Sequence, residues 1–457
     1  MRILKTFLLV VISQLCVAQT SDEGTIRQIY NKALAEGKSY SMLEYLSIKI
    51  GPRLSGSPGA AAAVEWSRHV MEDFGFDSVW LQPVMVPHWV RGQKEIGRIV
   101  NTKKMGTVEV NVCALGGSVS TGPDGIVANI VEVQNFEQLA QLGTKNVQGK
   151  IVFFNRPMDP TKIRTFSAYG GAVDQRAVGA SEAAKYGAVA ALVRSMGVNS
   201  EDYPHTGGMR YAPNTLKIPA FAISTKHADL LSKLLKDDKG VQMYVESHCE
   251  ILDDAPSFNV VGEIKGGEYK DEIIIVGGHL DSWDLAQGAH DDGAGCVQSI
   301  EVLRILSTMG YKPKRTLRAV MFMNEENGLR GGLKYAELAL KNQEKHIAAI
   351  ESDAGGFTPR GFTITAPEPV RKKIQSWKPL LEEYGLSDIG QEGGGADIGP
   401  LAPQGTALIG YLPDSQRYFN YHHTSQDTFD KVDKRELELG AASITALVYL
   451  IDQYGLK

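Results

Sequence analysis

The stretch DEIIIVGGHLDSWDLAQGAHDDGAGC, residues 271–296, decides how the fold of this chain is interpreted. It begins with a continuous apolar run, which is typical of a strand buried on both faces of a parallel sheet. Directly after the run comes a cluster of ionisable side chains: His279, Asp281, Asp284, His290, Asp291 and Asp292. Carboxylates that close together repel one another, and each resists removal from water. The sequence therefore predicts that something positively charged lies among them.

Strands and helices alternate along the chain from residue 259 onward. Two more apolar runs of strand length follow the first, at 317–326 and 346–353. The segments between the strands carry apolar residues at helical spacing, and residues 435–455 form an amphipathic helix. This alternation predicts an α/β fold with a doubly wound sheet flanked by helices.

Changes in composition divide the chain into parts. Residues 1–18 have the positive start and short apolar run of a secretory signal peptide, too short to span a bilayer. From 120 to 250 the chain reads as short strands with one or two helices, bounded by GGSVSTGPDG (116–125) and by the acidic DDAPSF (253–258). We therefore expect an exported protein in which residues 120–250 are inserted between 19–119 and 251–457.

The overall composition excludes some classes of protein. The chain has 457 residues, of which 43% are hydrophobic and 22% charged, as in ordinary globular proteins. A net charge of −5 gives no basic excess for nucleic-acid binding, and no segment after the signal peptide predicts a membrane span. Three dispersed cysteines remain after the signal peptide, and if one disulfide forms, Cys113–Cys249 is the preferred pair because Cys296 opens an apolar helix.

Metal-ligand residues follow the ends of three predicted strands. They are His279 with Asp281, Glu325 with Glu326, and Asp353, and Asp291 and the segment YHHTSQDT (421–428) add to them. In open α/β sheets the site lies at the carboxyl ends of the strands, so these side chains should converge. Imidazoles and carboxylates without thiolates favour zinc, with manganese or cobalt as substitutes. Two such ions about 3.5–4 Å apart can share one carboxylate and one water.

The adjacent pair Glu325–Glu326 indicates the reaction class. Neighbouring side chains on a strand point to opposite sides, so one carboxylate can bind metal while the other faces a water. The pattern predicts metal-assisted hydrolysis. Neither GxSxG nor HExxH occurs in the chain. Each motif alone has a plainer interpretation, such as a solvated acidic pair or a helix start capped by Asp292.

Six motifs in a fixed order carry a resemblance to a known family. They are GGHLDS, DDGAG, NEENGLRGG, ESDAGG, GGGADIGPL and HHTSQDT. Together they resemble the co-catalytic dizinc exopeptidases, which include bacterial aminopeptidases and glutamate carboxypeptidases. GPRLSGSPG (51–59) and VPHWVRG (86–92) narrow the resemblance to the carboxypeptidase Q branch. It covers essentially the whole mature chain and implies the mixed sheet of the zinc exopeptidase fold, a protease-associated cap domain as the insert, peptide substrates and a homodimer.

The resemblance implies a role for each site residue. The metal ligands would be His279 and Asp353 for one zinc, Glu326 and His423 for the other, and Asp291 as the bridge. Glu325 would be the general base and later the acid that protonates the leaving amine. Asp281 would fix the tautomer and orientation of His279. The family also implies a cis peptide between Asp291 and Asp292.

Five other residues have no settled role, and four of them keep two interpretations each. His422 is either packed locally or close enough to polarise the substrate carbonyl. His290 has no role in the family and is expected to be a loop residue. Asp397 is either a polar residue near the site or a helix cap. Trp89 and Arg91 either contact substrate or anchor their loop.

The sequence thus favours an exported dizinc exopeptidase acting on dipeptides or short peptides. An aminopeptidase acting on longer peptides would use the same residues, so the preferred end of the peptide stays open. A catalytically inactive homologue that only binds is the alternative from another class, and the intact ligand set argues against it. The intact set also argues against the one-metal glutaminyl cyclases.

Overall fold

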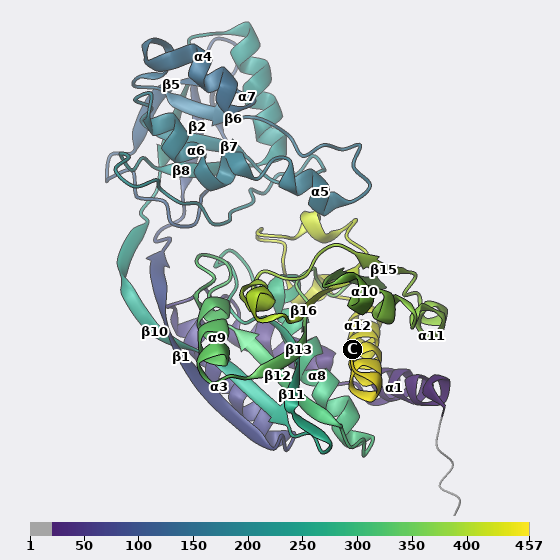
Figure 1. The fold of residues 1–457 in the computed structure, drawn as a ribbon. Coiled ribbons are helices and arrows are strands. Elements are labelled where there is room, and N and C mark those ends of the chain that lie inside the picture. Colours follow the sequence, from purple (N-terminus) through teal and green to yellow (C-terminus); the bar gives the residue numbers. More distant parts are fainter. Residues whose placement is uncertain (1–20, 457) are drawn as a thin grey trace, which may run out of the picture.

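The computed structural model describes residues 21–456 and contains two eight-stranded sheets, each covered by helices (Figure 1). The predicted signal peptide, residues 1–18, lies outside the described residues. Within residues 21–456, no helix is long and apolar enough to cross a membrane. The expected α/β class is therefore confirmed, and each of the two sheets forms its own α/β unit.

The first sheet has the strand order β1-β10-β12-β11-β13-β16-β14-β15. Its strands are β1 (Ser78–Val90), β10 (Glu250–Ile264), β11 (Tyr269–His279), β12 (Arg315–Phe322), β13 (Lys345–Glu351), β14 (Pro359–Thr365), β15 (Asp388–Gln391) and β16 (Ala407–Pro413). The central strands β12, β11, β13 and β16 are parallel, and antiparallel pairs join β10 and β14 to them. The sheet is thus mixed, as expected.

Alternating side chains of the central strands bury against helices on both faces. Ile274 and Val276 of β11 face one hydrophobic cluster, and Ile273 and Ile275 face the other. The first cluster is covered by α1 (Asp22–Glu36), α2 (Ser39–Glu44), η1 (Tyr45–Ile50), α3 (Pro58–Asp73), α8 (Ala294–Thr308), α10 (Glu368–Gln375), α11 (Lys378–Leu381), η3 (Glu382–Tyr384) and α12 (Lys434–Tyr454). The second is covered by α9 (Arg330–Lys341) and η4 (Gly399–Gln404). This two-sided burial explains why the strand at 273–276 has no polar residue.

The second sheet has the strand order β3-β2-β9-β5-β6-β7-β8-β4. Its strands are β2 (Ile96–Thr102), β3 (Gly106–Glu109), β4 (Val112–Ala114), β5 (Ile126–Val133), β6 (Ile151–Phe154), β7 (Ala190–Arg194), β8 (Ala220–Ile223) and β9 (Gln242–Glu246). Helices α4 (Phe136–Val147), α5 (Thr165–Gly170) and α6 (Asp174–Ala184) pack on one face, and α7 (Thr225–Asp237) packs on the other. Two separate hydrophobic clusters lie between this sheet and its helices.

Strands β1 and β10 connect the two sheets as a long antiparallel ribbon (Figure 1). The second sheet begins at Ile96, earlier than residue 120, where composition suggested a boundary. The stretch 253–258, interpreted from sequence as a closing loop, is part of β10 and pairs with β1. Residues 250–254 are exposed, so this part of the strand carries no apolar alternation that a sequence could reveal.

The three described cysteines are free and buried. The Cys113–Cys249 pair, preferred if a disulfide forms, is therefore not bonded in this structure. Cys249 packs in a cluster with Ala114, whereas Cys113, the preceding residue on β4, faces a different cluster. Adjacent residues of a strand point to opposite faces, so the strand geometry separates the two sulfur atoms.

Candidate metal centre

The predicted metal ligands meet at the carboxyl edge of the first sheet. His279 is the last residue of β11, Glu326 follows β12 and Asp353 follows β13. Asp291 comes from the short η2 segment (Ala289–Gly293), and His423 follows the η5 segment (Tyr418–Asn420). The five predicted ligands, from five separate segments, thus lie at one place, and the three that follow strands meet because parallel strands end at one edge of the sheet.

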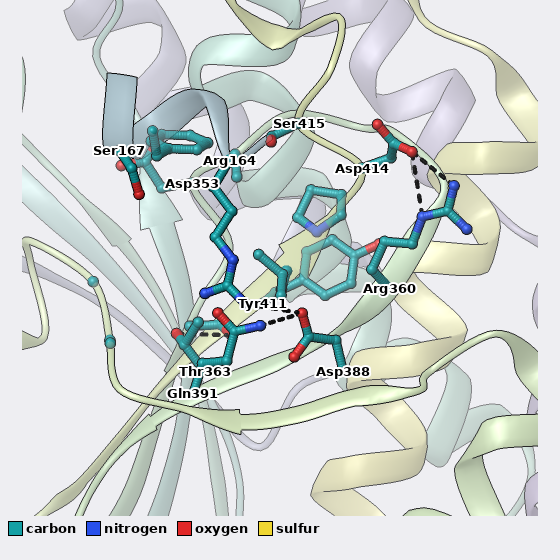
Figure 2. A pocket seen from close by; sticks show the side chains of 18 of the residues that line it. Arg164, Ser167, Asp353, Arg360, Thr363, Asp388, Gln391, Tyr411, Asp414 and Ser415 are labelled. Carbon is teal, nitrogen blue, oxygen red and sulfur yellow. Dashed lines mark hydrogen bonds and ion pairs between the residues drawn. The ribbon is translucent and has the colours of Figure 1, made fainter. Parts of the chain in front are cut away.

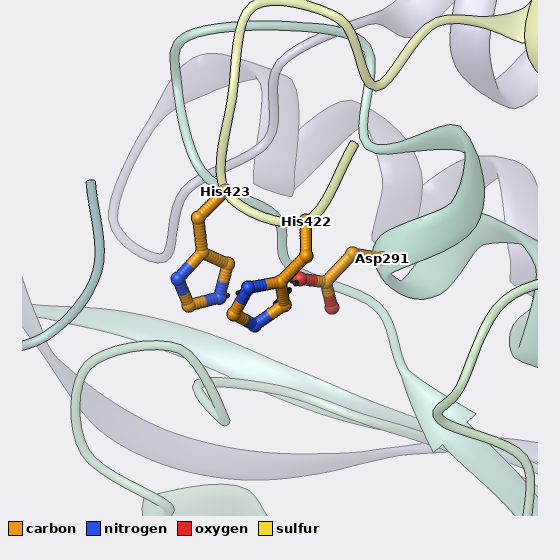
Figure 3. A group of neighbouring side chains, drawn as sticks. All are labelled: Asp291, His422 and His423. Carbon is orange, nitrogen blue, oxygen red and sulfur yellow. Dashed lines mark ion pairs between the residues drawn. The ribbon is translucent and has the colours of Figure 1, made fainter. Parts of the chain in front are cut away.

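Asp291 lies between two imidazoles. Its Oδ1 atom is 3.2 Å from Nε2 of His279, and its Oδ2 atom is 3.2 Å from Nε2 of His423. His279 Nε2 is also 3.5 Å from Asp353 Oδ1, and His423 Nε2 is 3.1 Å from Glu326 Oε2. The five side chains therefore form two groups that share one carboxylate. Figure 3 shows Asp291 facing His423, with His422 beside it.

The donor set fits divalent metal ions. Potential ligand atoms lie within 4.8 Å of one another in three overlapping groups, two of which contain His279 and two of which contain Asp291. All the donors are imidazole nitrogens or carboxylate oxygens, the set that zinc accepts in hydrolytic sites. Asp292 belongs to one group, but its oxygens accept the backbone N–H groups of His279 and Gly295 at 3.0 Å each. Its carboxylate is thus committed to the backbone, and one of its oxygens accepts an N–H from the first turn of α8, whose N-cap residue is Gly293.

The electrostatics of the centre show how strongly it attracts positive charge. Burial lowers the pKa of the His279 imidazole, but the carboxylates of Asp353 and Asp291 outweigh burial and hold that pKa well above its usual range. Burial, together with neighbouring carboxylates, raises the pKa of Glu326 to about 7 and raises the pKa of Glu325 well above its usual value. Bound cations neutralise such a cluster without protons.

Asp281 contacts His279 through its main chain. Its backbone carbonyl, rather than its carboxylate, accepts from Nδ1 of His279, at 2.9 Å. The carboxylate Oδ1 lies 4.0 Å from that nitrogen and accepts the backbone N–H groups of Asn324, at 2.6 Å, and Glu325, at 3.1 Å. Asp281 therefore fixes the His279 tautomer through its main chain and the Glu325 turn through its side chain.

Two residues that the sequence analysis did not single out hold the loops of the centre. Asp427 accepts the backbone N–H groups of His290, at 2.7 Å, and Asp291, at 3.1 Å. The fully buried Arg53 donates to three main-chain carbonyls, those of Leu280, Gln287 and Gly288, at 2.6–2.8 Å. Both residues lie in quoted motifs, HHTSQDT and GPRLSGSPG, but nothing in the sequence pairs them with the 280–291 loop. The peptide between Asp291 and Asp292 is cis, as the family resemblance implied.

The two histidines with open roles are packed among rings. His422 stacks on His423 with ring centroids 3.6 Å apart, and its Nε2 is 3.8 Å from Asp291 Oδ2. His290 stacks between Phe357 and Tyr421, at 4.2 and 5.1 Å, and burial lowers its pKa to about 3. His290 is thus a neutral packing residue, whereas His422 remains close enough to the centre to contact a substrate.

The remaining three residues also have defined surroundings. Arg91 forms ion pairs with Asp284, at 2.7 Å, and Glu95, at 2.9 Å, and Trp89 donates to the Ser118 carbonyl at 2.9 Å. Both side chains are buried, which supports their interpretation as loop anchors. Asp397 caps no helix: η4 has no side-chain cap, and within residues 21–456 neither carboxylate oxygen of Asp397 has a hydrogen-bond partner.

A cavity of about 600 Å³ opens beside Asp353 (Figure 2). It is lined by residues of the first sheet and its connections, which we call the first domain, and by residues of the second sheet and its helices (96–246), which we call the second domain. Arg164 and Ser167 enter from the second domain, and Asp388, Gln391 and Tyr411 belong to the first. The Arg164 guanidinium is 3.9 Å from Asp388 Oδ2 and its side chain is 63% exposed. The solvent-exposed guanidinium of Arg164 therefore lines the same cavity as the predicted ligand Asp353.

Comparisons with known proteins agree with this geometry. The model of Peptidase family M28 matches residues 259–448. Carboxypeptidase Q of Bos taurus is 34% identical over 424 residues, which are 93% of this chain and 86% of that protein. The crystal structure of a peptidase M28 precursor from Shewanella amazonensis SB2B has a TM-score of 0.90 at 33% identity, covering 95% of this chain and 98% of that one.

A more distant relative shares the fold alone. BSAP, a zinc aminopeptidase from Bacillus subtilis, has a TM-score of 0.64 at 20% identity, covering 90% of this chain and 94% of that one. The level of identity and the near-complete coverage of carboxypeptidase Q confirm the resemblance drawn from the six motifs, and with it the prediction of a metallopeptidase. The chain is similar to carboxypeptidase Q along most of its length and therefore belongs to peptidase family M28.

Proposed function

We propose that this protein is an exported dizinc exopeptidase that hydrolyses dipeptides or short peptides. The observation that carries the proposal is the position of Asp291, whose two oxygens each lie 3.2 Å from a different imidazole. A carboxylate between two ligand groups is what a bridged two-metal site requires. The donor set and the zinc aminopeptidase of the same fold support zinc, with manganese or cobalt as substitutes.

Each metal would have its own ligands in addition to Asp291. His279 and Asp353 would hold one ion, and Glu326 and His423 would hold the other. The ligand Glu326 is oriented by the backbone N–H of Trp283, which lies 3.2 Å from its Oε1. His279 is oriented by the main chain of Asp281. Such outer contacts fix the tautomers and rotamers that metal binding needs.

Glu325 would move the proton of the reaction. The zinc ions, when bound, supply a water nucleophile at neutral pH and polarise the scissile carbonyl. The Glu325 carboxylate takes a proton from the attacking water and then donates it to the nitrogen of the leaving amine. Oδ1 of Asp281 accepts the backbone N–H of Glu325 at 3.1 Å. This bond would keep the Glu325 carboxylate in the same orientation during both proton transfers.

The cavity beside Asp353 would receive one end of the peptide. Arg164 can pair with a free terminal carboxylate, which favours a carboxypeptidase or dipeptidase. The same cavity contains Glu351, Asp388 and Glu392, which can hold a terminal ammonium group. The second candidate, an aminopeptidase acting on longer peptides, therefore rests on these carboxylates.

The second sheet and its helices would be the protease-associated cap domain. Strands β2 to β9, residues 96–246, form this unit, and its residues line part of the cavity. A lid over the cavity limits the length of the substrate, which supports short peptides. We also propose that the protein is exported to the periplasm or beyond and that it assembles as a homodimer.

Metal analysis and a peptide panel test the proposal together. We expect about two zinc ions per chain by elemental analysis of purified protein. Dipeptides with both termini free should be cleaved, and blocking the C-terminus should abolish cleavage. Rapid trimming of C-terminally blocked peptides would favour the aminopeptidase, and a protein with no metal and no turnover would be the inactive binding homologue.

A further inference from the structure

His423 is held by the second domain, although it belongs to the first. The backbone N–H of Thr206 donates to the His423 carbonyl at 2.9 Å, and Nδ1 of His423 lies 3.3 Å from the Thr206 carbonyl. Thr206 lies between β7 and β8 of the second sheet. The backbone of His423 has φ +62°, a conformation that few non-glycine residues adopt. The paired contacts with Thr206 hold the ring and the main chain together in this conformation.

The segment that contains Thr206 is docked at two more points. The Asn199 side-chain amide donates to Oδ1 of Asn420 at 2.7 Å, and the Tyr203 hydroxyl donates to the Asn420 carbonyl at 3.2 Å. Asn420 is three residues before His423 in the same loop. Residues 199–207 of the second domain therefore run along the loop that carries the ligand.

A second group from the same domain competes for the same nitrogen. Nη1 of Arg176 lies 3.3 Å from Nδ1 of His423. A guanidinium can only donate, so its hydrogen bond requires a lone pair on Nδ1 and leaves the proton on Nε2. A carbonyl can only accept, so the bond to Thr206 puts the proton on Nδ1 and leaves the Nε2 lone pair for a metal. Thr206 and Arg176 thus favour opposite tautomers of His423.

The packing around the His423 ring keeps it from moving away from either Thr206 or Arg176. A Cβ atom at Gly207, which has φ +135°, would lie 2.7 Å from Nδ1 of His423 and 2.4 Å from Nη1 of Arg176. On its other sides the ring touches His422, at 3.6 Å, and Trp283, at 5.8 Å between centroids. The imidazole is therefore fixed where both neighbours act on it.

We propose that the second domain covers the metal centre and also controls how tightly that centre binds metal. Docking of residues 199–207 makes the Thr206 carbonyl the acceptor for Nδ1–H of His423, and this sets the metal affinity of the site formed by His423 and Glu326. Arg176 opposes metal binding there, through the other tautomer and through its charge. Thr206 is thus a positioning residue that acts across the domain boundary, and the inference rests on the dizinc function proposed above.

The test uses the full mature chain and two variants with opposite expected effects. Asn199→Ala/Tyr203→Phe loosens the docked segment and should weaken one of the two zinc sites by about tenfold, the lower end of what loss of an outer contact costs. Arg176→Met removes the competing donor and should tighten that same site. Thr165→Val is the matched control, because it removes another interdomain bond, to the Ser415 carbonyl at 2.9 Å, away from His423. It should leave both affinities unchanged.

Zinc affinities are measured by competition with a chromophoric chelator, and the absorption spectrum of the cobalt-loaded protein reports the geometry of the altered site. Circular dichroism checks folding, and Tyr203→Phe alone, which loses one hydroxyl, replaces the double variant if that one unfolds. Unchanged zinc affinity and cobalt spectrum in the loosened variant, or weaker binding in Arg176→Met, would overturn the inference while leaving the dizinc function intact. Fewer than two metals in the unaltered protein would overturn the dizinc function itself.

Discussion

Replacing Glu325 by glutamine keeps the size of the side chain and removes its capacity to carry a proton. The change leaves the ligands untouched, because Glu325 belongs to none of the three ligand groups that residues 21–456 form. It also leaves the backbone N–H of Glu325 bonded to Asp281 at 3.1 Å. We therefore expect the variant to fold, to bind two metals, and to lose only proton transfer.

The expected loss is large because Glu325 would act twice in each turnover. General acid–base catalysis contributes about 10²–10⁴-fold to a rate, and each tenfold step is about 1.36 kcal/mol of activation free energy. A residue that serves as both base and acid should reach the upper part of that range, so kcat should fall by about 10³–10⁴-fold. KM should change little, since glutamine does not alter the cavity.

The assay measures kcat and KM on a dipeptide, with metal content determined on the same sample. Glu337→Gln, the same chemical change at an exposed position on α9, is the control and should behave like the unaltered protein. If Glu325→Gln kept two metals and more than about a tenth of the rate, the catalytic assignment would be refuted. If it lost metal, Glu325 would be a ligand instead of a base.

Three further changes have defined outcomes. Asp291→Ala removes the shared ligand, so the metal content should fall below two per chain by elemental analysis; two tightly held ions would contradict the bridging role. Arg164→Met should raise KM by about tenfold for dipeptides with a free C-terminus and leave unchanged the inhibition constant of their C-terminal amides, which are not cleaved, since a charge-assisted bond is worth about 1.5–3 kcal/mol; equal effects on both would refute pairing with a carboxylate. Burial and the charge of Glu301 raise the pKa of Glu438 from 4.5 to about 7. The folded state therefore binds more protons than the unfolded chain between those values, and stability falls as pH rises through them. Glu438→Gln should then be more thermostable than the unaltered protein at pH 8 and no more so at pH 4; an equal difference at both would contradict the shift.

The sequence predicted that these side chains would lie close together, because three of them follow strand ends. An apolar run such as 273–276 identifies a buried parallel strand, and parallel strands bring their carboxyl ends to one edge. His279, Glu326 and Asp353 could therefore be grouped without a structure. The motif order supplied Asp291, which lies beyond the end of the first strand.

Features that depend on contacts between distant segments could not be predicted. The ribbon of β1 and β10 carries exposed polar residues at 253–254, so its sequence resembles a loop. Arg53 and Asp427 act through main-chain groups of another segment, and such bonds leave no pattern in the residue types they connect. The same holds for Thr206, whose carbonyl contacts His423 from the other domain.

A crystal structure of the zinc-loaded protein, with anomalous scattering recorded at the zinc edge, would show directly whether Asp291 bridges two metal ions. We expect two anomalous peaks about 3.5–4 Å apart, one on each side of the Asp291 carboxylate. One peak would lie against His279 and Asp353, and the other against Glu326 and His423. A single peak, an empty map, or two peaks that Asp291 does not join would contradict a two-metal site bridged by Asp291.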